Sequence, residues 1–344
     1  MPTFTFPVVL LEGSPHDRGR QHGERFRDEI AAALAAMHRE HTPAAFASAR
    51  EKAEAAWPKI LDGSPDIAAE LQGIAGGSGT KLTDILLRVG FEFFDTAPAA
   101  GCTAYAFKGP HGAILGQNWD APPDAAKELA LLIHVGPHGF EQAVIASVGG
   151  LAWVGCNRHG LTLLNNDLML RSRGPGLPSQ IVRRILLKEP SVEAALAAMR
   201  SLPHMAGRSY LLGDATGDVA GIEVSAIRGV RVNQRSAPVL HTNHALDPDI
   251  KADEDEEALM KSYPSSRRRL EILQRIASGV SSMDQLAAVL GNREGIPNSI
   301  CKSHSQAEPT QTAFSIIVDC GRRVLHVCPG SPAEHAYCPI LLPT

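Results

Sequence analysis

The sequence has no apolar run that approaches the roughly 20 residues of a membrane-spanning helix. Its first basic residue is Arg18, which follows the short apolar stretch at the N-terminus, so no secretory signal is predicted. The net charge is −4, from 33 Lys and Arg against 37 Asp and Glu. This balance provides neither a basic face for nucleic acid nor a polybasic patch for a membrane surface, and we predict contact with neither.

The chain also lacks the usual metal-binding and disulfide patterns. Its six cysteines include no C-x-x-C pair, which argues against a zinc framework and a dense disulfide scaffold. Its 14 histidines show no H-E-x-x-H or other ligand spacing. We therefore predict no metal site and no cofactor, and we interpret the cysteines as reduced thiols of a cytoplasmic protein, several of them buried.

The character of the sequence changes at Gly101. The residues before it predict mainly helices, including one that begins with Ser14 as N-cap and Pro15 at the first helical position. After Gly101, short strands interleave with pairs of helices, without the regular alternation of a doubly wound sheet. We interpret residues 1–344 as a single α+β domain in which helices cover antiparallel sheets.

Several local predictions can be tested against the structure. The run Gly76-Gly77-Ser78-Gly79 is interpreted as a break between helices. A single helix is predicted over 258–277. The acidic segment 247–257 is interpreted as a solvated loop and helix entry, with a functional lid as the alternative. Side chains that could line a binding pocket, each equally able to be a core residue, are Tyr105, Trp119, Trp153, Leu168 and Met169.

The turn 108–112 is predicted to join two strands. If it has five residues, continuing the register makes Cys102 face Asn118. Asp120 then lies on the same face as Cys102, one diagonal of about 7–8 Å away. A slip of one residue would place the two side chains on opposite faces, so this prediction depends on the length of the turn.

Gly101 and Cys102 form a junction at which the chain could cut itself. A thiol can attack the carbonyl of the preceding residue, and water can hydrolyse the resulting thioester; a glycine there leaves the attack unobstructed. Cleavage would free the α-amine of Cys102, whose reference pKa of about 7.7–8.0 lies near that of a free thiol at ~8.5. This amine can act as the base for the nucleophile of its own residue. The more common role of an internal cysteine is a buried apolar side chain.

Seven motifs in order resemble those of the acyl-coenzyme A:isopenicillin N acyltransferase family, within the N-terminal nucleophile (Ntn) hydrolases. They extend over nearly the whole chain: Gly13–Gly23, Gly101–Tyr105 with Gly116–Asp120, Gly155–Leu161, His241–His244, Ser265–Leu270, Ser299–Cys301 and Gly330–Pro332. The resemblance implies a four-layer αββα sandwich. It also implies self-cleavage into an α chain, 1–101, and a β chain, 102–344, which remain associated.

The same resemblance implies roles for individual residues. Cys102 would be the nucleophile, with its α-amine as base, and Asp120 would support that amine. Asn243 would stabilise the tetrahedral oxyanion, a function typically worth ~2.7–4 kcal/mol of barrier. Asn166 is a weaker candidate near the oxyanion, because a turn residue is equally expected there. Enzymes of the bile-salt-hydrolase type have an arginine where this chain has Gln117, which argues against their cation-assisted chemistry here.

The implied substrate is a small non-peptide amide or an acyl-CoA thioester, and either water or an amine could take the acyl group from Cys102. Arg171 and Arg173 are candidates to meet an anionic substrate, although solvated loop arginines are more common. Two other hypotheses stay open. One is an uncut Cys-His hydrolase using His241 or His244, and the other is a non-catalytic binding protein. A homo-oligomer also stays open.

Overall fold

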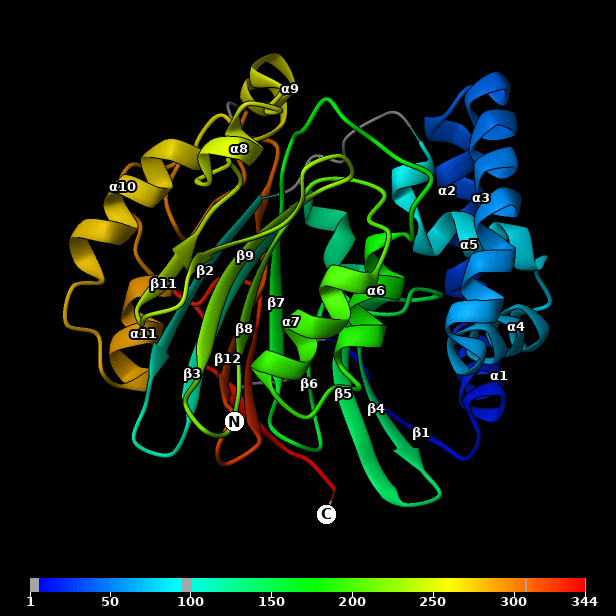
Figure 1. Cartoon of the computed structure of the whole chain (residues 1–344), viewed down its shortest axis with the longest axis horizontal. Helices are drawn as coiled ribbons and strands as arrows, with labels where there is room; N and C mark the ends of the chain where they lie inside the picture. The colour runs from blue at the N-terminus through cyan, green and yellow to red at the C-terminus, as the bar shows by residue number, and fades with distance from the viewer. Residues whose placement is uncertain (1–5, 95–100, 307, 344) are drawn as a thin grey trace.

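Two β-sheets stacked face to face form the centre of the protein, with helices against both outer faces (Figure 1). The computed structural model describes residues 6–94, 101–306 and 308–343. A mainly apolar core fills the space between the sheets, and separate apolar cores lie between each sheet and its helices. This order of layers confirms the α+β, four-layer αββα sandwich that the resemblance implies.

The larger sheet has eight strands, and all its neighbouring strands are antiparallel except the first pair, which is parallel. In spatial order they are β1 (Val8–Glu12), β4 (Leu129–Gly136), β5 (Gly139–Ser147), β6 (Val154–Asn157), β7 (Thr162–Asp167), β8 (Arg208–Gly213), β9 (Val219–Ser225) and β10 (Gly229–Gln234). The end of β7, at Asn166 and Asp167, lies at the edge of the candidate site described below.

The smaller sheet has six antiparallel strands. In spatial order they are β11 (Val239–His241), β2 (Gly101–Lys108), β3 (Ala113–Ala121), β12 (Gln311–Asp319), β13 (Val324–Pro329) and β14 (Cys338–Leu341). Gly101 is the first residue of β2, and the strand is buried from there to Phe107. The Gly101-Cys102 junction therefore lies inside the protein, at one end of an interior strand.

Seven helices cover the outer face of the eight-stranded sheet. They are α1 (Pro15–Arg25), α2 (Arg27–Glu40), α3 (Pro43–Gly63), α4 (Pro65–Ser78), α5 (Leu82–Val89), α6 (Ser179–Leu186) and α7 (Val192–Ser201), with the short 3-10 helix η1 (Phe91–Phe93) after α5. The predicted start of α1 is confirmed, because the Ser14 side chain accepts a hydrogen bond from the backbone N–H of Asp17 and Pro15 is the first helical residue.

Helices α1 and α4 cross so closely that their backbones touch. A Cβ added at Gly77 would come within 3.0 Å of the carbonyl oxygen of Arg20, and one at Gly23 would crowd the carbonyl oxygen of Ile74 in the same way. The predicted break between helices is present, but it falls at Gly79, at φ 73°, because residues 76–78 still belong to α4. Gly23 and Gly77 serve close helix packing rather than chain reversal.

The outer face of the six-stranded sheet is covered by α10 (Ser266–Ile276) and α11 (Met283–Leu290). The short helices α8 (Pro248–Lys251) and α9 (Glu256–Ser262) precede them, and the 3-10 helix η2 (Pro123–Glu128) follows β3. The prediction of one helix over 258–277 is wrong. Pro264 separates α9 from α10, because the residue before a proline is disfavoured in helical conformation and Tyr263 lies outside that region, at ψ 53°.

The acidic segment 247–257 is less solvated than predicted. Asp253 and Glu254 are buried. Glu254 accepts hydrogen bonds from the backbone N–H of Ala245 and from Arg267, and Asp253 accepts from Ser225. Carboxylates with such partners hold this segment against the end of the sheets rather than leaving it in water.

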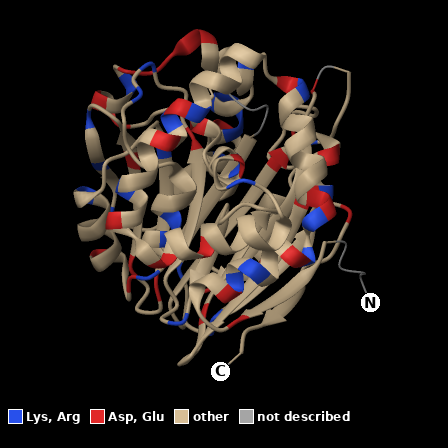
Figure 2. Ribbon diagram, turned by 90° about the vertical axis from the view of Figure 1, so that its right-hand side faces the viewer, with Lys and Arg blue, Asp and Glu red and all other residues tan. Residues whose placement is uncertain are grey.

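Charged side chains lie mostly on the helices and loops around the sheets, whereas the strands at the centre are largely uncharged (Figure 2). Within the part of the chain that the structure describes, no helix is both long enough and apolar enough to cross a bilayer.

Candidate active site

The pairing of β2 with β3 differs by one residue from the predicted register. Lys108 pairs with Ala113, so the turn has four residues, 109–112, rather than five. As a result Cys102 faces Trp119, and Asp120 faces Gly101. The prediction that Cys102 and Asp120 share a face is wrong, because a shift of one residue moves a side chain to the other side of the sheet.

Cys102 and Asp120 nevertheless flank the same peptide bond from opposite sides. The Cys102 side chain belongs to the core between the two sheets, together with Trp119. The Asp120 carboxylate lies beside Gly101, where an added Cβ would be 3.0 Å from Asp120 Oδ2 and 3.3 Å from Lys302 Nζ. Gly101 therefore lies against an acid and a base, both buried.

Asp120 and Lys302 belong to a buried polar network on the outer face of the six-stranded sheet. Asp120 Oδ1 accepts a hydrogen bond from the Thr312 hydroxyl at 2.8 Å, and Lys302 Nζ lies 3.1 Å from both Glu308 and Thr310. Burial raises the pKa of Asp120, while the positive charges of Lys302 and Arg269 oppose that rise. Burial likewise lowers the pKa of Lys302, opposed by the negative charge of Asp120.

The side chain of Asn243 contacts the Gly101-Cys102 peptide directly. Its Oδ1 accepts a hydrogen bond from the backbone N–H of Cys102 at 2.9 Å. Its Nδ2 donates to the carbonyl oxygen of Asp167 at 3.2 Å, which leaves the second amide hydrogen for another acceptor. The structure thus brings together Cys102 and Asn243, which are 141 positions apart in the sequence.

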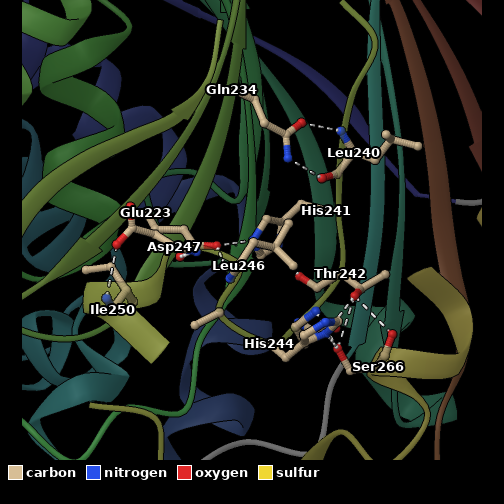
Figure 3. Close-up of polar contacts among 12 residues, drawn as sticks. Glu223, Gln234, Leu240, His241, Thr242, His244, Leu246, Asp247, Ile250 and Ser266 are labelled. Carbon is tan, nitrogen blue, oxygen red and sulfur yellow. Dashed lines mark hydrogen bonds and ion pairs between the residues drawn. The ribbon is translucent and has the colours of Figure 1, made fainter. Parts of the chain in front are cut away.

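Polar contacts around the end of β11 join Glu223, His241 and Ser266 to neighbouring residues (Figure 3). The same network fixes Asn243. Before it, His241 Nε2 lies 2.8 Å from Glu223. After it, the backbone N–H groups of Leu246 and Asp247 donate to that same Glu223 carboxylate. The Ser266 hydroxyl accepts from the backbone N–H of Asn243, so the residue is held at both its neighbours and its own backbone.

Arg269 and Lys302 lie at this junction although the sequence patterns do not predict either of them. Arg269 makes the direct contacts. It is fully buried on α10 and donates from Nη1 to the carbonyl oxygen of Cys102 at 2.5 Å and from Nη2 to Asn243 Oδ1 at 2.8 Å. Its Nε donates to the Ser265 hydroxyl. The motif Ser265–Leu270 contained the signal, because three adjacent arginines there include one, Arg269, that a helix must turn inward.

A guanidinium is therefore present beside Cys102 although Gln117 occupies the position where other enzymes have an arginine. Gln117 instead holds β7, since its amide exchanges hydrogen bonds with the backbone N–H and carbonyl of Asn165. The absence of an arginine at 117 does not leave the site without a cation, because α10 supplies one.

Asn166 is the next residue along β7 and is fully buried. Its side chain points to the opposite face from that of Asn165 and to the same face as that of Leu164. Leu164 and Cys102 both belong to the core between the sheets. Among the described residues neither polar atom of its side chain has a hydrogen-bond partner. A buried amide without partners is costly, and such groups are typical of sites that bind a polar ligand.

The Cys102 thiol is held in its protonated form in this environment. Burial raises its pKa, and the negative charges of Asp167 and Asp120 raise it further. A hydrogen bond involving Gln117 and the charge of Arg269 oppose the rise without cancelling it. The thiol therefore needs a nearby base before it can act as a nucleophile at neutral pH.

A cavity of about 480 Å³ opens next to this junction, with Asp167 in its wall. Leu168 and Met169 line it, so these two pocket predictions agree with the structure. Tyr105 does not, because it packs under α10 and α11 on the other side of the sheet. Trp119 and Trp153 pack against each other in and beside the core, with ring centroids 5.6 Å apart.

The fold and junction describe an αββα protein with a buried Gly-Cys peptide at the start of an interior strand. Residues 107–334 match the family described as acyl-coenzyme A:6-aminopenicillanic acid acyl-transferase. The match covers more than half of the chain, so the protein belongs to this family, as its motifs indicate.

Individual relatives are distant. The 40 kDa form of acyl-coenzyme A:6-aminopenicillanic-acid-acyltransferase from Emericella nidulans is 27% identical over 328 residues, which cover 90% of this chain and 89% of that protein. Among solved structures, penicillin V acylase from Agrobacterium tumefaciens has 14% identity and a TM-score of 0.38, covering 66% of this chain and 83% of its own. A mutant of conjugated bile acid hydrolase from Clostridium perfringens has 12% identity and a TM-score of 0.37, covering 66% and 89%.

Proposed function

We propose that this protein is a self-processing cysteine Ntn enzyme, which cuts itself between Gly101 and Cys102 and then transfers acyl groups through a Cys102 thioester. The proposal rests on two hydrogen bonds to the backbone of Cys102. Asn243 holds the N–H of the Gly101-Cys102 peptide, and Arg269 holds the carbonyl oxygen of the next peptide, Cys102-Thr103, so the backbone of Cys102 is fixed on both sides of its Cα. A nucleophile whose backbone is fixed in this way has less freedom to lose when it attacks the neighbouring carbonyl carbon.

Self-processing begins when the Cys102 sulfur adds to the carbonyl carbon of Gly101 and the thiol proton passes to the departing nitrogen. The C–N bond breaks, which leaves a Gly101 thioester and a free α-amine on Cys102. Water then adds to the thioester and releases the Gly101 carboxylate and the thiol. The α chain, 1–101, and the β chain, 102–344, remain associated, because α1–α5 share an apolar core with strands of the β chain.

The mature enzyme uses the new amine as its base. Asn243 Oδ1, which accepts from the Cys102 N–H in the uncut chain, keeps the amine beside the thiol. Its second Nδ2 hydrogen, together with the unpartnered amide of Asn166, supplies donors for the tetrahedral oxyanion. Asp120 and Lys302 lie on the far side of the junction, where the carboxylate supports the positive charge that the amine gains.

The substrate is a small amide or an acyl-CoA thioester. Membership of an acyltransferase family supports this class, as does the name of the Emericella nidulans relative. After the acyl group is on Cys102, water or an amine removes it, and the two outcomes share every earlier step. We favour hydrolysis, because water is always available as an acceptor.

An uncut Cys-His hydrolase is the less favoured alternative. It would need His241 or His244 beside the thiol. Among the described contacts, the His241 ring is bound to Glu223 and to the carbonyl oxygen of Thr242, and His244 is bound to Thr242 and Ser266. Neither ring has a hydrogen bond to Cys102 among these contacts, which supports the α-amine as the base.

Mass spectrometry of the intact purified protein, with N-terminal sequencing, tests the proposal. We expect two chains, one of which begins at Cys102, and an acyl adduct on that residue after brief exposure to an activated amide. Cys102→Ala should give one uncut, inactive chain. Cys156→Ala is the matched control, because it removes another buried thiol from the same core and should cut normally. An active wild-type enzyme that remains a single chain would refute self-processing.

A further inference from the structure

The cavity beside the junction has the size of a small-molecule site. Its volume of about 480 Å³ falls in the range of roughly 300–1,000 Å³ that such sites occupy. It lies between the loop after β7 and helix α9, and Asp167 is common to the cavity and the junction. Asn243 links this shared residue to the candidate nucleophile, because it contacts both Asp167 and Cys102.

The three acidic side chains that line the cavity are already occupied within the protein. Glu92 pairs with Arg208 at 2.6 Å. Asp167 pairs with the same arginine and accepts from the Tyr263 hydroxyl. Asp255 caps helix α9 by accepting from the backbone N–H of Ala258. Glu92 and Asp167 thus share the charge of one arginine, and Asp255 keeps its negative charge while it caps the helix.

The remaining charged side chains of the lining are all basic. They are Arg171, Arg173 and Lys261, and each is exposed. Within the described part of the chain, no carboxylate lies within 4.0 Å of any of the three. Arg173 donates only to the backbone carbonyls of Glu92 and Phe94. With Arg208, four basic side chains line the cavity against three carboxylates, so its net charge is positive and attracts anions.

The position of Arg171 is fixed relative to α9. The backbone N–H of Arg171 donates to the carbonyl oxygen of Asp253, and the N–H of Asp255 donates to that of Met169, so the loop after β7 is tied to the segment that enters α9. Arg171 and Lys261 are thereby presented to one cavity from two elements whose backbones are joined. Because the two backbones are already joined, only the side chains have to become ordered when an anion binds.

We propose that the substrate carries a carboxylate, which binds in this cavity to Arg171 and Lys261. The inference rests on the proposed function, because it names the substrate class of the same site. The planar guanidinium can donate two parallel hydrogen bonds to a carboxylate, and the ammonium adds a point charge. Leu168, Met169 and Phe91 provide apolar surface for the chain between the carboxylate and the bond that is broken.

The carboxylate can belong to the acyl group or to the departing amine, and two pairs of probes distinguish these sources. Glutaryl-4-nitroanilide against pentanoyl-4-nitroanilide tests the acyl group, and pentanoyl-glycine against pentanoyl-glycinamide tests the amine. In one pair we expect the processed enzyme to prefer the carboxylate by about tenfold or more in kcat/KM, as charge-assisted hydrogen bonds predict. This preference should fall as salt is added.

Two substitutions connect the preference to the cavity. Arg171→Gln and Lys261→Gln should each lower kcat/KM for the preferred carboxylate about tenfold, mainly through KM. The neutral member of the pair should change by less than about twofold, since exposed charges contribute little elsewhere. Arg200→Gln is the matched control, because Arg200 is an exposed arginine on α7 that does not line the cavity.

A binding measurement separates this inference from the proposed function. Titration calorimetry with the uncut Cys102→Ala chain and the same four probes needs no turnover. If that chain binds one carboxylate probe more tightly than its neutral partner, and Arg171→Gln removes the difference, the inference stands even if no amide is cleaved. Equal turnover, or equal binding, of the carboxylate and the neutral probe in both pairs would overturn the carboxylate inference. If the enzyme cleaves amides but does not discriminate between the probes, the inference fails while the proposed function stands.

Discussion

The side-chain oxygen of Asn243 lies 2.9 Å from the backbone nitrogen of Cys102 and accepts its hydrogen bond. This contact joins the end of β11 to the start of β2, and it concerns the peptide bond that the proposed mechanism cuts. Under the proposed mechanism, one amide orients the junction before cleavage and the α-amine after it. Processing and turnover should share a dependence on this residue.

Asn243→Ala should slow both self-cleavage and turnover by about 10²–10³-fold, the effect of removing one oxyanion donor. The rate of processing can be followed by the disappearance of the 344-residue chain in intact mass spectra, and turnover by amide hydrolysis. Asn243→Asp is the informative companion, because it keeps the acceptor for the Cys102 N–H and loses the Nδ2 donor. Unchanged rates in both variants would remove Asn243 from the mechanism.

Replacement of Arg269, even by lysine, is expected to slow self-processing. Arg269→Lys keeps the charge but cannot donate at once to the Cys102 carbonyl, to Asn243 and to Ser265. We expect processing to slow at least about tenfold, as the loss of one charge-assisted hydrogen bond predicts. Time-resolved mass spectrometry during refolding of the uncut chain would measure it.

The neighbouring Arg268 provides the control for this prediction. It lies on the same helix, is exposed, and pairs with Glu271 at the surface. Arg268→Lys should therefore process at the wild-type rate. Equal rates for all three proteins would show that the fork geometry of Arg269 is dispensable.

The fold was largely predictable because local sequence patterns predict most of its strands and its helix starts. Ser14 caps α1 where the sequence predicts it. The four layers needed the family resemblance, since local patterns do not say which helices cover which sheet. Thr42 and Pro43 mark the start of α3 in the same local way, but its alanine-rich interior gives only a weak apolar stripe.

The candidate site was less predictable, because its contacts join distant parts of the chain. The family motifs identify Cys102 and Asn243 as candidate site residues. They do not set the pairing of β2 with β3, and one residue more or less in the turn decides on which face Asp120 lies. Arg269 could not be selected from three adjacent arginines without the helix that orients them. Lys302 had no pattern of its own, because burial of a lysine is a property of the assembled sheet.

Gly77→Ala should destabilise the protein by about 1–3 kcal/mol or more, because the added methyl would overlap the backbone of α1 at Arg20. Urea unfolding of the Cys102→Ala chain, which stays in one piece under the proposed mechanism, would measure the change. Gly76→Ala is the matched control one residue earlier, where an added methyl meets nothing within 4 Å. That substitution should stabilise the helix by about 0.5–1 kcal/mol. Equal effects at the two positions would contradict the proposed helix contact.

Stability should fall on mild acidification because of a buried histidine of α1, His22. Burial lowers the pKa of His22 to about 4; the Glu70 charge opposes that shift and the Arg184 charge adds to it. Its Nε2 accepts a hydrogen bond from the backbone N–H of Gly149, which requires the neutral ring. The pKa of His22 is 6.5 in the unfolded chain and about 4 in the folded one, so between these values only the unfolded chain is protonated. Stability is therefore lost as the pH falls through this window.

The variant His22→Gln isolates this contribution, because glutamine keeps an acceptor near Gly149 and does not titrate. Between pH 7 and pH 5 the chain with His22 should lose on the order of 1–2 kcal/mol more unfolding free energy than the variant. Urea unfolding at the two pH values, again in the Cys102→Ala chain, measures the difference. Glu70, whose pKa is held to about 2 mainly by the Arg184 charge acting against burial, loses its contribution only below about pH 4.5, outside this window. An identical pH dependence in both chains would mean that His22 is not the group responsible.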